Sequence, residues 1–107
     1  MRVNFHTAFL NASGNEAYEM IDGERLVQMI DDVLCQGLFD GRFLRPSGND
    51  DEDARLKLRA FELYRKIRAA GGEVEITAEE ASMIKRMALL LSPGAYGQIY
   101  QLIEGGK

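Results

Sequence analysis

Several residue types are scarce in this chain of 107 residues, and each scarcity excludes a class of structure. There is one cysteine, Cys35, so a disulfide within the chain is excluded and a reducing compartment is the natural setting. There is one histidine, His6, which excludes the Cys/His clusters that hold structural zinc. The longest apolar run covers only residues 87–91, whereas a membrane-spanning helix needs about 20 apolar residues.

Length and composition are those of one ordinary folded domain, which we place at residues 1–107. The apolar content of 46% is enough for one hydrophobic core. The net charge of −4 argues against nucleic acid or an anionic membrane as the partner of the surface as a whole. The first ten residues, MRVNFHTAFL, have no long apolar segment, so we expect no signal peptide and a cytoplasmic location.

The region around which we expect the fold to be organised is residues 77–91, TAEEASMIKRMALLL. Thr77 and Glu80 form the S/T-x-x-E pattern of a capping box, which predicts the start of a helix. The apolar residues that follow cover about half of the helix circumference, wider than the ~100° stripe of a surface helix. We therefore expect this helix to be covered from two sides, with Leu90 extending its apolar face.

The N-terminal third is predicted to contain a β-hairpin and a helix. Residues 2–10 and 16–21 alternate between apolar and polar side chains, and the turn-forming sequence NASGN joins them. This pattern predicts that the two segments pair as a hairpin. Asp22 is the expected N-cap of the following helix, which places Leu26 on its apolar face and ends near Gly37.

The remaining elements are delimited by glycine, proline and capping residues. Residues 38–51 contain Asp-Gly and Pro-Ser-Gly turn signals and are predicted to form a mobile loop. A second helix is expected over residues 52–70, a short third strand over 73–77, and a last helix capped by Ser92. Gly97 and a second glycine one turn earlier predict close packing of the last helix. The fold class is α+β, with the hairpin packed against about four helices.

No group of residues has the spacing of a catalytic or metal site, so we expect no enzyme activity, no cofactor and no metal. His6 lies on the outward face of the first strand, without a partner that spacing can identify. Cys35 lies beside an apolar helix face and is expected to be a small buried hydrophobe. Residues 49–53 begin like a calcium loop, but the required glycine and glutamate are missing. We interpret them as capping the next helix.

The second helix has two features that bear on a partner. Its basic residues could contact the phosphates of a nucleic acid. The favoured interpretation is that these residues form a solvent-exposed face whose charge is balanced by acidic neighbours. Leu58 and Phe61 lie three residues apart, outside the core stripe. Either the loop covers them, through Phe39 or Phe43, or a second chain does. The candidate interaction residues are Leu58, Phe61, Arg55 and Arg65.

Three segments of the chain resemble a family of small proteins of tailed bacteriophages and prophages. They are RAFELYRKI, EVEITAEEASMIKRMA and SPGAYGQIYQLIE, and the N-terminal VNFHTAFLNASG is similar to the opening strand and turn of that family. No activity or catalytic residue is assigned to the family, so the resemblance implies only a setting. That setting is a bacterial host cytoplasm, with an accessory role in assembly or host takeover.

These observations favour a non-enzymatic protein that acts by protein–protein interaction, with an unidentified protein partner or weak self-association. The alternative is a nucleic-acid-associated accessory protein that uses the basic helix over residues 52–70. A membrane partner is not expected.

Overall fold

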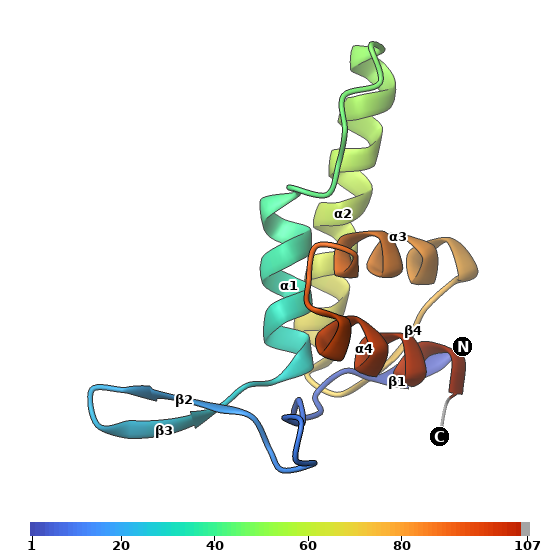
Figure 1. Ribbon diagram of the computed structural model, residues 1–107. Helices are drawn as coiled ribbons and strands as arrows, with labels where there is room; N and C mark the ends of the chain where they lie inside the picture. Colours follow the sequence, from blue (N-terminus) through green and yellow to red (C-terminus); the bar gives the residue numbers. More distant parts are fainter. Residues whose placement is uncertain (106–107) are drawn as a thin grey trace.

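The computed structural model describes residues 1–105 and confirms the α+β fold class (Figure 1). Within these residues there are four helices and two antiparallel sheets of two strands each. The helices are α1 (Ile30–Asp40), α2 (Asp50–Ala70), α3 (Ala78–Ala88) and α4 (Pro93–Gly105). The strands are β1 (Arg2–Asn4), β2 (Tyr18–Ile21), β3 (Glu24–Val27) and β4 (Glu73–Glu75).

The predicted capping box starts helix α3 as expected. Thr77 accepts a hydrogen bond from the Glu80 amide at 3.1 Å, and Glu80 accepts one from the Thr77 amide at 2.8 Å. Helix α3 packs against both α1 and α4, in agreement with a helix covered from two sides. The helix ends at Ala88, however, because the amides of Leu90 and Leu91 bond to carbonyls only three residues back. Leu90 therefore lies outside the helix and is 53% exposed, so its predicted place on the core face was wrong.

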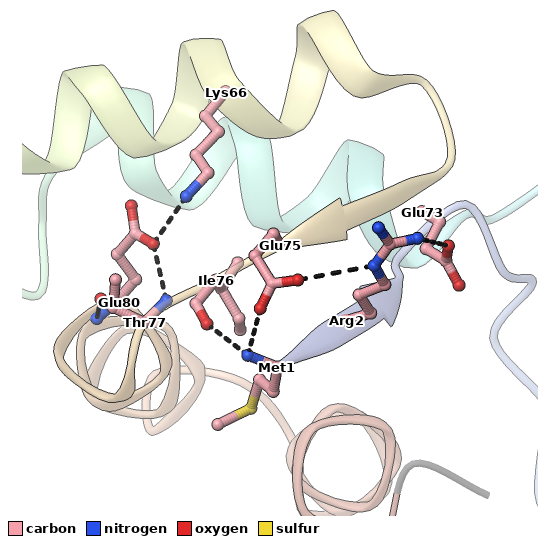
Figure 2. A network of polar contacts seen from close by, with 8 residues as sticks. All are labelled: Met1, Arg2, Lys66, Glu73, Glu75, Ile76, Thr77 and Glu80. Atoms are coloured by element: carbon pink, nitrogen blue, oxygen red, sulfur yellow. Dashed lines mark hydrogen bonds and ion pairs between the residues drawn. The ribbon is translucent and has the colours of Figure 1, made fainter.

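Strand β1 lies beside β4 (Figure 2). The two strands pair antiparallel, with Val3 opposite Val74. The short strand expected over residues 73–77 is thus confirmed at residues 73–75. The hairpin predicted from residues 2–10 and 16–21 is present only next to its turn, as an antiparallel bridge between Leu10 and Glu16, because the strand at residues 2–4 pairs with β4 instead. Both Val3 and Val74 face the core, which explains the pairing, since it buries one apolar face of each strand. The Arg2 guanidinium contacts Glu73 on the outer face at 3.1 Å.

The longer hairpin of the structure is formed by β2 and β3. Asp22 and Gly23 form its two-residue turn, with φ angles of 51° and 80°. Positive φ at both central positions is the mark of a type I′ turn, which matches the twist of paired strands. Asp22 is therefore not a helix cap, and Leu26 lies in a strand rather than on a helix. Helix α1 begins only at Ile30.

Helix α1 continues past Gly37 to Asp40, and Gly41, with a φ of 67°, provides the left-handed cap. The predicted loop is accordingly shorter, because residues 38–40 belong to α1 and residues 50–51 to α2. Phe43 folds back from this loop into the core. The polar cluster at the end of the loop acts as a cap, since Asn49 accepts a hydrogen bond from the Glu52 amide.

The core lies where the helices and the β1–β4 sheet meet. Fully buried side chains come from every part of this assembly, including Phe5 after β1, Leu34 of α1, Leu63 of α2, Ile84 of α3 and Ile99 of α4. Helix α2 contributes only one stripe to this core, and strands β2 and β3 contribute nothing to it. Helix α2 and these two strands together hold seven of the large apolar side chains that are exposed in the described residues.

Candidate protein-interaction surfaces

The outer face of α2 is the first candidate surface. Leu58 and Phe61 are 56% and 43% exposed, whereas Ala60 and Leu63 on the opposite face are buried. A 21-residue helix with a single buried stripe leaves its other side to solvent. Two large apolar residues on that side form a patch that no element of the described chain covers.

The loop expected to cover this patch does not do so. Phe43 is buried in the core, and Phe39 lies on α1 with 61% of its surface exposed. Phe39 does contact Tyr64 edge to face at 5.2 Å, and Tyr64 in turn lies 5.9 Å from Phe61 between ring centroids. The three aromatic rings thus extend the exposed patch from α2 toward α1 instead of closing it.

The basic residues of α2 do not form one free strip. Lys66 is 2.9 Å from Glu80 of α3, and Arg68 is 3.0 Å from Asp32 of α1. Arg65 lies over the ring of Phe61, at 5.9 Å from its centroid. Two of the cations therefore tie α2 to its neighbours, and a third borders the apolar patch. This arrangement gives the rim-and-centre pattern of a protein interface.

The second candidate surface is the β2–β3 arm, residues 18–27, which extends away from the helices (Figure 1). Every residue of both strands is exposed. Tyr18, Met20 and Val27 share one face of the arm, and the ring of Tyr18 is covered by the Arg25 guanidinium at 4.0 Å. The opposite face carries an apolar pair and two acidic residues: Ile21, Leu26, Glu19 and Glu24.

A groove of about 810 Å³ lies between this arm, helix α1 and the connection from α3 to α4. Its walls are mainly apolar, with Leu26 on the arm, Val33 on α1 and Leu90 on the connection. Carboxylates at its border include Glu19 and Asp32. The groove explains why Leu90 is exposed, since it forms part of a wall that faces the arm across open space.

The arm was missed in the sequence although its signal is present. Asp-Gly between two short segments of β-forming residues is a strong hairpin signal. The segments YEMI and ERLV carry apolar residues on both faces, so they do not show the clean alternation of a half-buried strand. Leu26 also falls at helical spacing from the residues of α1, which favoured the wrong interpretation.

His6 does have a partner that spacing could not show. Its Nδ1 atom lies 2.9 Å from Oδ2 of Asp31, a residue that is only 7% exposed. The other carboxylate oxygen of Asp31 has no hydrogen-bond partner among the described residues. The His6 ring itself is 57% exposed, so it closes the solvent side of a buried carboxylate. The contact joins the segment after β1 to the first turn of α1.

Cys35 is buried, as its position beside the apolar face of α1 predicted. Its sulfur lies 3.9 Å from the carbonyl oxygen of Tyr64. Burial raises the pKa of the Cys35 thiol above its ordinary value, so the reactive thiolate is disfavoured. The residue packs α1 against α2.

Three comparisons with known proteins yield no relative. No protein-family model matches the chain, and no curated protein or solved structure matches it. Within residues 1–105, no helix is long and apolar enough to cross a membrane. The same residues hold no group of three or more His, Cys, Asp or Glu side chains placed to bind a metal.

Proposed function

We propose that the protein is a non-enzymatic binding protein, whose partner is an extended segment of another protein held by the β2–β3 arm and its groove. The setting we propose is that of the resemblance, an accessory protein of a phage or prophage in the bacterial cytoplasm. The observation that carries the proposal is the exposure of the arm. Five large apolar side chains on it are 36–62% exposed: Tyr18, Met20, Ile21, Leu26 and Val27.

The energetics of a two-stranded arm support this proposal. An isolated hairpin is marginally stable in water, and a third strand or a covering element is needed to stabilise it. Each strand of the arm has one edge that no strand of the described chain pairs with. An added strand would satisfy the backbone groups of that edge and cover the apolar side chains in one step.

The charge of the arm indicates what the added strand contains. The arm carries Glu19, Asp22 and Glu24 against the single cation Arg25, whose guanidinium already lies over Tyr18. The groove beside it is also lined by Asp40 and by Asp32, which pairs with Arg68, against Arg42 as the one lining cation within residues 1–105. A complementary segment therefore alternates apolar residues with lysine or arginine, because the former fill the groove and the latter face the acidic border.

The proposal can be tested by selecting binders to the immobilised protein from a display library of random peptides. We expect selected sequences to be apolar and basic, without acidic residues. A synthetic peptide of the selected sequence should bind wild type but lose at least tenfold in affinity to L26D, which places a charge in the groove. L89D is the matched control, because Leu89 is 70% exposed and lies outside the groove lining.

Three outcomes would count against the proposal. The proposal is contradicted if the library yields no consistent sequence or yields acidic sequences. It is also contradicted if L26D and L89D lose peptide affinity equally. The alternative of nucleic-acid binding predicts a different result, namely a salt-dependent shift of DNA or RNA that is abolished by charge reversal at Arg55 and Arg59. A shift of that kind, without peptide binding, would replace the proposal by the alternative.

A further inference from the structure

The exposed face of α2 carries a heptad pattern as well as an apolar patch. Its members recur at spacings of three and four, and all of them are exposed. This is the spacing of a coiled-coil seam, in which two positions per heptad face a partner helix. The positions, in order, are Asp51, Ala54, Leu58, Phe61, Arg65 and Arg68.

We propose that α2 pairs along this seam with α2 of a second copy of the chain, antiparallel and about a two-fold axis between residues 59 and 60. In that register Leu58 lies opposite the partner's Phe61. Ala54 lies opposite the partner's Arg65, where a small residue leaves room for a long one. Asp51 lies opposite the partner's Arg68. Each contact occurs twice, as an isologous interface requires.

The charge distribution along α2 selects the antiparallel direction. Its first turn is entirely acidic, with Asp50, Asp51, Glu52 and Asp53, and basic residues predominate in the rest of the helix. Antiparallel pairing brings the acidic end of each helix to the basic end of the other. Parallel pairing would place two acidic ends together, and like charges at such an interface repel.

The positions that flank the seam agree with the same register. Arg55 and Glu62 occupy equivalent flanking positions two turns apart, too far along the helix to pair with each other. In the antiparallel register Arg55 lies beside the partner's Glu62, as charged flanking residues do in coiled coils. Within the described residues neither of them takes part in an ion pair, so both side chains are available.

The seam is also sterically accessible. The neighbours of α2 contact it mainly from other directions, α3 through Lys66 and α1 through Tyr64. Only Arg68, at the end of the seam, also pairs with Asp32 of its own chain. Phe39 lies at the border of the seam beside Tyr64, so a second helix would cover part of its exposed ring. One pair of helices of this length buries less than the roughly 1,200 Å² of a standard stable interface. The expected dimer is therefore weak and depends on concentration.

This inference goes beyond the proposed function, since it concerns a different surface and a different occupant. The test is sedimentation equilibrium of the full chain over a range of concentrations. R55E faces the partner's Glu62, and E62R faces the partner's Arg55, so each single variant is expected to weaken dimerisation about tenfold. The double variant R55E/E62R restores both contacts with reversed polarity and should dimerise like wild type.

General charge repulsion predicts a different pattern from this register. E62R reduces the net charge of −4, so it would strengthen association if only overall repulsion mattered. R86E on α3 is the control for R55E, because it makes the same charge change at an exposed position off the seam. All three positions are exposed, and circular dichroism will verify that each variant is folded.

Several results would overturn the inference. A wild type that stays monomeric at millimolar concentration excludes the dimer. If the double variant dimerises as weakly as the single variants, this register is excluded. If R86E loses as much dimer affinity as R55E, a contact specific to the seam is excluded. L58E/F61E is expected to be monomeric and folded. A folded L58E/F61E that still dimerises would place the interface elsewhere.

Discussion

Gly37 of α1 lies directly against Met87 of α3, so closely that a Cβ atom on the glycine would stand 2.3 Å from the methionine sulfur. Met87 is buried in the core, so its sulfur and its Cγ atom would have to shift to admit a methyl group. We expect G37A to lower the free energy of unfolding by about 1–2 kcal/mol, because overpacking outweighs the better helix propensity of alanine. Urea denaturation measures the change. An unchanged or raised midpoint would show that Met87 repacks without cost.

Gly97 of α4 is expected to behave in the opposite way. A Cβ atom there would meet no atom of another element within 4 Å, so the close packing expected from the two glycines of α4 was wrong. Alanine is favoured over glycine inside a helix by about 1 kcal/mol. G97A should therefore raise the denaturation midpoint, in the same experiment in which G37A lowers it. A destabilised G97A would reveal a packing role that the structure does not show.

Ile84 tests the central position of α3. Its side chain is fully buried between neighbouring helices, and truncation of such a residue leaves a cavity. I84A should cost about 2–5 kcal/mol of stability. By hydrogen exchange, the amides of α3 should be the most protected of the chain. Exchange of the Ile84 amide as fast as that of residues 41–49 would contradict the organising role of this helix.

Glu80 links the capping box to α2 and makes stability depend on pH (Figure 2). Partial burial acts to raise its pKa, but hydrogen bonds from Lys66 and the Thr77 amide outweigh burial and hold the pKa below its ordinary value. A carboxyl whose pKa is lower in the folded state stabilises the protein above its unfolded pKa of about 4.3. That contribution disappears as the pH falls through the folded pKa.

E80Q is the variant that isolates this charge, because glutamine keeps an oxygen that can accept the Thr77 hydrogen bond. We expect its melting temperature to lie below that of wild type at pH 7 and to approach it below about pH 4. E79Q is the control, an exposed neighbour in the same first turn. If the melting temperature of E80Q is still below that of wild type at pH 3, geometry rather than charge accounts for the loss of stability.

Cys35 offers a probe of opening between α1 and α2. Its burial and raised pKa predict slow reaction with a thiol reagent under native conditions. The rate should rise in parallel with the unfolded fraction as urea is added. Rapid modification of the native protein would show that these two helices separate readily, or that the thiol is exposed in solution.

Features that depend only on neighbouring residues could be predicted from the sequence. Thr77 and Glu80 start α3, and Ser92 bonds to the Ala95 amide at the start of α4, each as expected. The cap of α2 comes from the expected cluster at residues 49–53, although the helix begins two residues earlier than predicted. A cap needs partners only three residues away, so its chemistry is readable locally. The outer position of Leu58 and Phe61 was also readable, because helical spacing places them off the core stripe.

Contacts between distant segments were decided only by the tertiary structure. Strand β1 pairs with β4 some seventy residues later, and spacing cannot show which of two candidate strands buries Val3 better. The glycines show the same limit, because the helical residues Gly37 and Gly97 look alike in sequence and differ only in the neighbour each one meets. The Asp31 partner of His6 and the groove beside the arm likewise exist only once α1 has docked. Packing, rather than local propensity, decided each of these features.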